Sequence, residues 1–127
     1  MSKIEIRAFT TWLGDNEICY TVVKPNAVVE IADAIENSAI VKEISDGKTY
    51  PMLVNLKEIK SITKEARDHF SMQGRTPGIK AIGLLIKSPA STIIGNFFLG
   101  LNKSVVPVKL FTKEEKAVVW LKQFLKK

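Results

Sequence analysis

The chain has 127 residues, a formal net charge of +6 and a single cysteine. A chain of this length lies within the range of one domain and can bury a core that holds without disulfides or metals. One cysteine excludes both an internal disulfide and a CxxC zinc or redox motif. We therefore expect one domain that spans residues 1–127.

No segment has the pattern of an export signal or a membrane helix. The N-terminus alternates charged and aliphatic residues, whereas a signal peptide has a continuous apolar stretch. The most apolar window, residues 93–101, is far shorter than the roughly 20 residues that span a bilayer. Together with the lone cysteine, these features favour a soluble, cytoplasmic protein.

The positive charge is concentrated near the C-terminus. From Lys103 onward, seven lysines stand against two glutamates, which gives +5 of the total of +6. Lysines at the end of a helix suit the negative end of its dipole, and the arginines that bind phosphate best number only three in the chain. The charge therefore indicates a solvated helix face, and nucleic acid is not an expected partner.

The first elements in chain order are two predicted β-strands, residues 3–13 and 17–23, both rich in β-branched and aromatic residues. Gly14-Asp15-Asn16 between them tolerates the positive φ that a hairpin turn needs. Cys19 falls in the second strand, where a small apolar side chain packs well, and no neighbouring base is expected to activate its thiol. The chain is thus expected to open with a β-hairpin.

A long amphipathic helix is predicted next, over residues 27–45. Its apolar face consists of residues at helical spacing, namely Val28, Ile31, Ala32, Ile35 and Ala39. Asp46-Gly47 follows as a C-terminal cap. This helix is the first of four that the pattern predicts.

A strand, a helix and a further strand follow. Residues 50–56 have the composition of a buried strand, with Pro51 acceptable near its start. Thr63 is a suitable N-cap for a helix that runs to about Gln73. Residues 79–86 are nearly all aliphatic, which is typical of a strand that is covered on both faces.

The last third of the chain continues this alternation. Ser88 followed by Pro89 opens a helix that is predicted to reach Leu101, and residues 105–111 form the fifth strand. The final helix begins with a capping box at residues 112–115. Its apolar stripe consists of Ala117, Trp120, Leu121, Phe124 and Leu125.

The order of the predicted elements is ββαβαβαβα. This order predicts an α/β domain with a five-stranded mixed sheet, an N-terminal hairpin and four helices. Strands that alternate with helices imply parallel crossovers of right hand, so the second strand of the hairpin is expected to begin a βαβαβαβ run.

Motifs for the common catalytic and nucleotide-binding sites are missing from the sequence. There is no GxGxxG, P-loop or GxSxG, each of which needs glycines at fixed offsets. His69 is the only histidine and has no second histidine or cysteine at metal-ligand spacing, which favours a structural role. We therefore expect a protein that is not an enzyme and that has no catalytic residues, cofactor or metal.

Several segments resemble a known group of bacterial proteins. The opening order of strand, strand and helix, followed by Val54-Asn55-Leu56 and a helix near Thr63, is similar to the STAS domain of anti-sigma-factor antagonists. The later half carries the more specific signature, which consists of Ser88-Pro89, residues 94–99, Asn102-Lys103, Pro107, residues 110–112, Ala117 and Trp120-Leu121. This signature resembles the uncharacterised bacterial proteins grouped as STAS/SEC14-like or SpoIIAA-like.

The resemblance implies a SpoIIAA/STAS-like fold and a non-catalytic regulatory or protein-interaction role, with a protein partner whose identity it does not give. Its SEC14-like side implies an alternative, which is a small carrier for an apolar or lipid-like ligand. Such a carrier would need a cavity of roughly several hundred Å³.

In the phospho-switch members of this group, a partner kinase phosphorylates a serine in an Asp-Ser-Ser-Gly-like turn at the start of the second helix. The position that matches this serine is Glu65, and Ala66 replaces the glycine, so the sequence departs from the switch motif. Ser61 and Thr63 lie nearby, at a helix N-terminus where added phosphate is favoured. They are candidate phospho-acceptors, with turn residue and N-cap as their alternative roles.

The third predicted helix has a broad apolar stripe, which contains Ile93, Ile94, Phe97, Phe98 and Leu101. The stripe either makes an ordinary core contact or offers a surface to a protein partner, a second copy of the chain or an apolar ligand. The candidate residues for that surface are Ile94, Phe97, Phe98 and Leu101.

Overall fold

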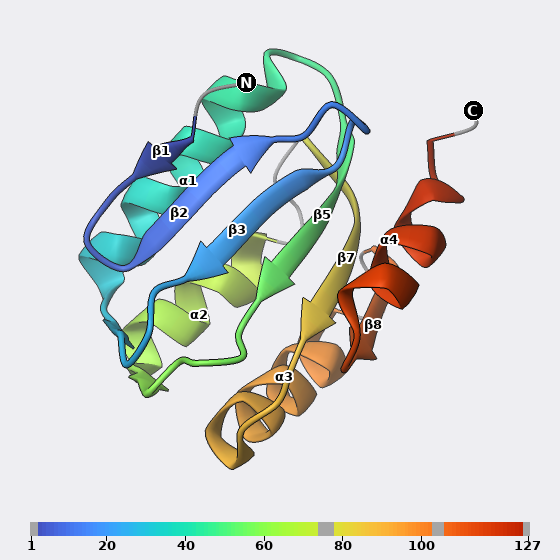
Figure 1. Cartoon of the computed structure of the whole chain (residues 1–127). Coiled ribbons are helices and arrows are strands. Elements are labelled where there is room, and N and C mark those ends of the chain that lie inside the picture. Colours follow the sequence, from blue (N-terminus) through green and yellow to red (C-terminus); the bar gives the residue numbers. More distant parts are fainter. Residues whose placement is uncertain (1–2, 74–77, 103–105, 126–127) are drawn as a thin grey trace.

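The computed structural model of the chain describes residues 3–73, 78–102 and 106–125. The main feature of the fold is a six-stranded mixed sheet with the strand order β1-β2-β3-β5-β7-β8 (Figure 1). The strands are β1 (Ile4–Glu5), β2 (Phe9–Leu13), β3 (Cys19–Val23), β5 (Tyr50–Asn55), β7 (Ile79–Leu85) and β8 (Val108–Phe111). Strand β2 runs antiparallel to β1 and β3, whereas β3, β5, β7 and β8 are parallel to one another.

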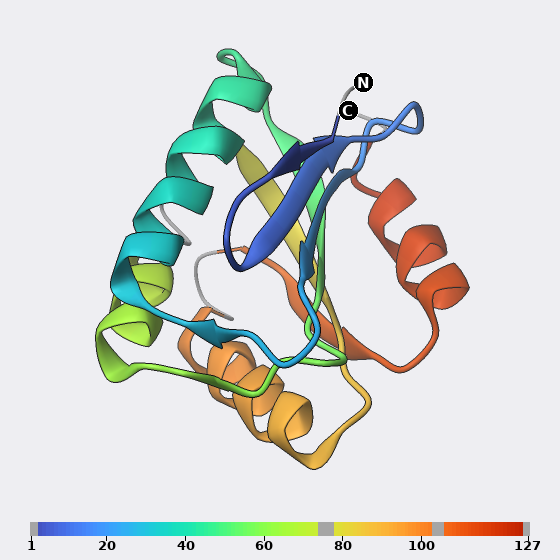
Figure 2. The same cartoon turned by 60° about the vertical axis from the view of Figure 1, so that its left-hand side comes forward.

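The described residues include four helices, which cover both faces of this sheet. Helices α1 (Ile31–Ser45), α2 (Lys64–Gln73) and α3 (Pro89–Asn102) lie on one face, and α4 (Glu114–Lys122) lies on the other (Figure 2). Two short strands, β4 (Val28–Val29) and β6 (Ser61–Ile62), pair in parallel outside the main sheet. Within the described ranges, no helix is both long and apolar enough to cross a bilayer.

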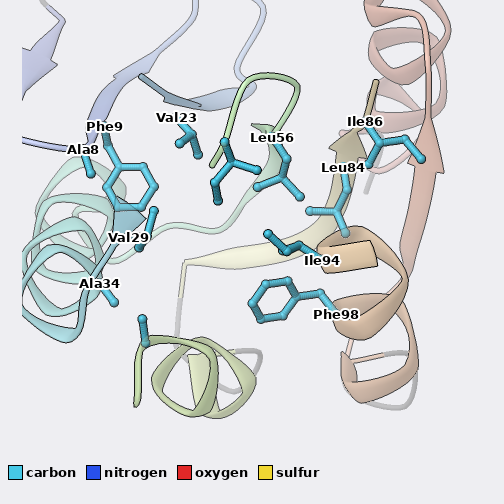
Figure 3. Close-up of a cluster of buried hydrophobic side chains, with 12 residues drawn as sticks. Ala8, Phe9, Val23, Val29, Ala34, Leu56, Leu84, Ile86, Ile94 and Phe98 are labelled. Atoms are coloured by element: carbon cyan, nitrogen blue, oxygen red, sulfur yellow. The ribbon is translucent and has the colours of Figure 1, made fainter. Parts of the chain in front are cut away.

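Each face of the sheet has its own apolar core. The core under α1, α2 and α3 contains Phe9 of β2, Leu84 of β7 and Phe98 of α3 (Figure 3). The core under α4 contains Leu53 of β5 and Leu121 of α4. Because the central strands are covered on both sides, their nearly continuous apolar sequence agrees with the prediction for β7.

The predicted fold class and the order of the four helices are confirmed, but the N-terminal strand is split in two. The Ile6 N–H donates to the Phe9 carbonyl over 2.9 Å and closes a turn within the predicted strand of residues 3–13. Strand β1 then folds back along β2 as an antiparallel pair. Ala8 and Phe9 are neighbours yet both buried, which the alternation of a continuous strand does not allow. The main sheet therefore has six strands where five were predicted.

Two predicted details of the first half are corrected. Helix α1 begins at Ile31 and not at residue 27, because Val28–Val29 pair with β6. In the hairpin loop the left-handed residue is Glu17, with a φ of 66°, and not one of residues 14–16. The Asn16 side chain accepts a hydrogen bond from the Ile18 N–H at 3.1 Å. This bond spans Glu17, the residue at which the chain reverses.

Two boundaries near the C-terminus also differ or stay open. The predicted capping box at residues 112–115 is wrong, since α4 starts at Glu114 with Lys113 as its N-cap and no side-chain cap. Thr112 therefore lies one position too early for its hydroxyl to reach the free amides of the first turn. The fifth predicted strand, residues 105–111, is shorter than expected, since β8 begins at Val108 and residues 106 and 107 are not part of it; residue 105 lies outside the described residues.

Candidate interaction surface and interior cavity

The outward face of α1 is apolar. Ile31 and Ile35 are 38% and 52% exposed, and Ala32 and Ala39 are also exposed. We call these four residues the α1 outer face. The buried side of the helix consists instead of Asp33, Ala34, Asn37, Val41 and Ser45. The apolar face predicted for this helix thus points away from the core, which is the reverse of an ordinary amphipathic helix.

Asp33 anchors the start of α1 to the turn between β1 and β2. Its carboxylate accepts hydrogen bonds from Arg7 Nε at 3.0 Å, from Arg7 Nη2, and from the backbone N–H of Glu30 at 2.8 Å. Burial acts to raise the pKa of Asp33, but the hydrogen bonds from Arg7 and Glu30 outweigh it, so the pKa lies below its ordinary value. The ionised carboxylate therefore stabilises this end of the helix.

Asn37 anchors the middle of α1 to the sheet. Its Nδ2 donates to Thr11 Oγ1 over 2.8 Å, and Thr11 Oγ1 lies 3.3 Å from Thr21 Oγ1. Buried polar groups are costly unless they are paired, so these contacts strongly favour one rotation of the helix about its axis. Asp33 and Asn37 are four residues apart and share one side of α1. When both point inward, the isoleucines are turned toward solvent.

The start of α2 lies beside the start of α1 (Figure 2). Val28 and Val29 pair with Ser61 and Ile62, and the Thr63 N–H donates to the Val29 carbonyl at 3.0 Å. The two candidate phospho-acceptors, which lie in this region, have different surroundings. Ser61 is exposed, whereas Thr63 is half-buried and its Oγ1 accepts a hydrogen bond from the Ala66 N–H at 3.2 Å, as an N-cap does.

His69 links α2 to α1. Its Nε2 lies 2.8 Å from Ser38 Oγ, and Ser38 Oγ donates to the Ala34 carbonyl at 2.9 Å. The histidine thus holds two helices together.

The candidate residues of α3 divide between core and surface. Ile94 and Phe98 are each 8% exposed and belong to the core, where Phe98 points toward the space between the helices and the sheet (Figure 3). Phe97 is half-buried, with the Arg67 guanidinium carbon 4.9 Å from the centre of its ring. The side chain of Leu101 lies outside the described residues.

Among the described residues of α3, one large exposed aliphatic side chain is missing from the predicted surface. Ile93 is 71% exposed, because it precedes the inward-facing Ile94 and projects to one side of it. The sequence does not indicate which of Ile93 and Ile94 is exposed, since both are aliphatic and both lie on the predicted stripe.

Cys19 is buried at 3% exposure in β3, as its predicted packing role requires. Burial raises the pKa of its thiol to about 12, so the thiol stays protonated and unreactive near neutral pH. Among the residues that the structure describes, no group of three or more His, Cys, Asp or Glu side chains is placed to hold a metal ion.

A cavity of about 90 Å³ lies between the sheet and helices α1, α2 and α3. Its lining is aliphatic and aromatic except for Thr21, Asn37 and Ser38. The volume is well below the roughly 300 Å³ at which pockets for drug-sized molecules begin. The cavity is thus too small for the lipid-like cargo that the carrier alternative requires.

The fold is shared with solved structures of low sequence identity. An uncharacterised protein of the DUF3478 family with a SpoIIAA-like fold, from Shewanella loihica PV-4, is 12% identical, with a TM-score of 0.66 over 90% of this chain and 92% of that chain. An anti-sigma factor antagonist from Mycobacterium paratuberculosis is 14% identical, with a TM-score of 0.63 over 91% and 95% of the two chains. This likeness shows the fold alone, and it confirms the predicted SpoIIAA/STAS-like fold.

Sequence comparison assigns the family. No curated protein matches the chain. A protein of unknown function from Arthrobacter sp. FB24 is 30% identical over 87% of this chain and 90% of its own, with a TM-score of 0.35. A family profile matches residues 11–125. The chain therefore belongs to the family described as Domain of unknown function (DUF7793).

Proposed function

We propose that the chain is a non-catalytic STAS-like regulatory module, which binds a protein partner through the α1 outer face and the adjoining start of α2. The observation that carries this proposal is the exposure of Ile31 and Ile35 on a helix whose buried side is largely polar. Contiguous exposed aliphatic side chains are typical of protein-binding surfaces. The fold shared with an anti-sigma factor antagonist supports a role in protein binding.

The energetics of α1 favour a covered outer face. Burial of an isoleucine side chain contributes roughly 1.5–3 kcal/mol, and the isolated chain gains only part of this at Ile31 and Ile35. A partner that covers both residues would recover the remainder at the interface. The polar anchors Asp33 and Asn37 keep the helix from turning these side chains into its own core.

The surroundings of the outer face define the chemistry of the partner. Glu36, Lys42 and Glu43 are exposed on α1, and Lys60, Ser61 and Lys64 are exposed where α2 begins, so charges of both signs border the outer face. A complementary partner would therefore present an aliphatic surface with both acidic and basic side chains at its edge. Charge at the edge would speed association, while the aliphatic centre would supply most of the affinity.

We further propose that this binding does not require phosphorylation. The position that matches the switch serine is Glu65, and the Thr63 hydroxyl is used as a cap by the Ala66 N–H. Ser61 is the exposed hydroxyl of the two candidates. Intact-mass analysis of the protein purified from its own host tests this proposal. We expect the unmodified mass, and stoichiometric phosphate on Ser61 or Thr63 would contradict it.

Site-specific photo-crosslinking in the native host tests the binding surface. A photo-reactive phenylalanine analogue replaces Ile35 in one variant and Val119 in a matched control, since Val119 is a 65% exposed aliphatic residue on α4. We expect a discrete crosslinked product from position 35 that disappears when Ile31→Glu is added. Equal products from both positions, or a product from position 119 alone, would overturn the proposed surface.

The mass of the crosslinked product also tests a homodimer. A product of twice the chain mass would identify a second copy as the partner. Among the described residues of α3, Ile93 is the large aliphatic side chain most available to a dimer contact, because Ile94 and Phe98 are each only 8% exposed. The same photo-reactive residue at position 93 distinguishes that contact from one through α1.

A further inference from the structure

We propose that the cavity under α1, α2 and α3 is a binding site for a small, neutral, mostly apolar molecule that carries one hydrogen-bond donor, such as a phenol. The site is distinct from the α1 outer face. Asn37, Ser38 and Val41 line the cavity from the inner side of α1, whereas the outer face points to solvent.

The cavity is lined by elements that are far apart in the sequence, and it is partly open to solvent. Strands β2, β3, β5, β7 and β8 form its floor, and α1, α2 and α3 form its walls. Its lining includes Val54 and Ile82 from the sheet and Phe70 and Phe98 from the helices. Protein interiors contain few voids larger than a water molecule, and each one lowers stability in proportion to its volume. A partly open, mostly apolar pocket of about 90 Å³ can admit a small molecule from solvent.

Asn37 provides a polar group for such an occupant. It is 3% exposed, and its Nδ2 donates to Thr11 Oγ1. Among the described residues, its amide oxygen has no hydrogen-bond partner. Because Asn37 lines the cavity, this oxygen can accept a hydrogen bond from a molecule bound there, so a donor on the ligand would be selected over an apolar analogue of the same shape.

Water is a poor occupant of this cavity. A buried water needs roughly two to four polar partners, whereas apolar cavities stay dry. The Ser38 hydroxyl is already engaged with the Ala34 carbonyl and His69, and the Thr21 hydroxyl lies within 3.3 Å of Thr11 Oγ1. A water molecule in the cavity would have the amide oxygen of Asn37 as its one remaining partner. That single hydrogen bond does not replace the several hydrogen bonds that the water makes in bulk solvent.

The volume limits the size of the ligand. A dry apolar cavity of roughly 150 Å³ holds one benzene molecule, so a cavity of about 90 Å³ admits at most a single ring with slight movement of its lining. An acyl chain is too large. One hydroxyl on such a ring would satisfy Asn37 while the ring packs against the aliphatic lining.

Methyl-resolved NMR of the full chain with phenol as the probe tests the site. We expect saturable shifts of the Val54, Ile82 and Val108 methyl signals, which line the cavity, and none for Ile93 and Val119, which are exposed. Benzene is expected to bind the same site roughly fivefold to tenfold more weakly, because it cannot donate to Asn37. Shifts confined to exposed methyls, or no shifts while the protein stays folded, would overturn the site.

Asn37→Leu tests the polar contact. The variant keeps the size of the side chain and removes the acceptor, so phenol affinity is expected to fall to that of benzene. If phenol binds the wild-type chain no more tightly than benzene, the contact with Asn37 is disproved. The comparison of phenol with benzene uses the wild-type chain, so it tests the contact with Asn37 even if Asn37→Leu does not fold.

Discussion

Helices α1 and α4 cover opposite faces of one sheet, and they bury opposite kinds of side chain. Helix α4 packs Ala117 and Leu121 against the strands at 0% exposure and leaves its lysines in solvent. Helix α1 buries Asp33 and Asn37 against the sheet and leaves Ile35 in solvent. Helix α4 thus shows ordinary amphipathic packing, with its apolar side against the sheet, whereas α1 turns its polar side inward and its apolar side to solvent.

The difference lies in what the neighbouring strands offer to each helix. Under α4 the strands present aliphatic side chains such as Leu53 and Leu85. Beside α1 lie Thr11 of β2 and Arg7 of the turn between β1 and β2, and these form hydrogen bonds with the polar residues of the helix. Polar partners in the right place can therefore outweigh the tendency of an aliphatic stripe to face the core.

The largest effect is expected in α4, where packing is ordinary. Leu121→Ala removes a fully buried side chain that lies against Gly83 of β7, and it should lower the free energy of unfolding by roughly 3 kcal/mol. Urea unfolding followed by circular dichroism measures this loss. Val119→Ala is the control, since Val119 is exposed and its truncation should cost less than about 0.5 kcal/mol. Similar losses for both variants would contradict the orientation of α4.

A smaller effect is expected when the polar anchor of α1 is removed. Asp33→Asn loses charge-assisted hydrogen bonds to Arg7 and to the Glu30 amide, which should cost roughly 2 kcal/mol of unfolding free energy. Glu36→Gln is the control, because Glu36 is exposed on the same helix. An Asp33→Asn variant as stable as wild type would break the comparison, since α1 would then need no polar anchor.

The same variant gives a prediction for pH. The pKa of Asp33 is lowered in the folded state, so its stabilisation is fully present above the unfolded pKa of roughly 3.9 and is lost as pH falls through the lower folded value. The difference in unfolding free energy between wild type and Asp33→Asn should therefore shrink below about pH 4. Urea titrations at a series of pH values measure this difference, and a gap that widens toward acid would contradict the sign.

An effect of roughly 1 kcal/mol is expected where α2 begins beside α1. Thr63→Ala removes the hydroxyl that accepts the Ala66 N–H, and loss of an N-cap typically costs about 1 kcal/mol. Ser61→Ala is the matched control, because Ser61 is exposed two residues earlier. Thermal unfolding of the two variants separates these roles, and equal melting temperatures would show that Thr63 does not cap the helix.

The smallest effect on stability is expected at the α1 outer face. Ile35→Gln replaces an exposed aliphatic residue with a good helix former and should change the unfolding free energy by less than about 0.5 kcal/mol. Chemical denaturation measures this value beside that of Leu121→Ala. A loss of about 2 kcal/mol or more at position 35 would mean that the isoleucine is buried, and the contrast between the helices would disappear.

Local signals in the sequence predict most of the fold. The apolar run of β7 and the cap residues Thr63 and Ser88 each depend on neighbouring residues, and the structure bears them out. The apolar stripe of α4 is confirmed at Ala117, Trp120 and Leu121, whereas Phe124 and Leu125 follow the end of the helix at Lys122. The split of the first strand was not predictable in this way. It depends on the Ile6–Phe9 turn, which the alternating residues of that segment conceal.

The candidate surface on α1 could not be read from the sequence, because it depends on contacts between distant segments. Arg7 and Asp33 are 26 residues apart, as are Thr11 and Asn37, and no local pattern links either pair. The aliphatic stripe was visible, but its direction was not. Asp33 and Asn37 are four residues apart and so lie on one side of the helix, but this spacing alone does not show that the side has polar partners.

The orientation of α1 can be measured directly by adding a soluble paramagnetic agent to the methyl-labelled protein and recording the relaxation of each isoleucine. We expect Ile31 and Ile35 to be relaxed strongly, as Ile93 is, whereas Ile18 and Ile59 at 0% and 4% exposure stay protected. Protection of Ile31 and Ile35 to the level of Ile18 would contradict the outward-facing stripe, and with it the proposed partner surface.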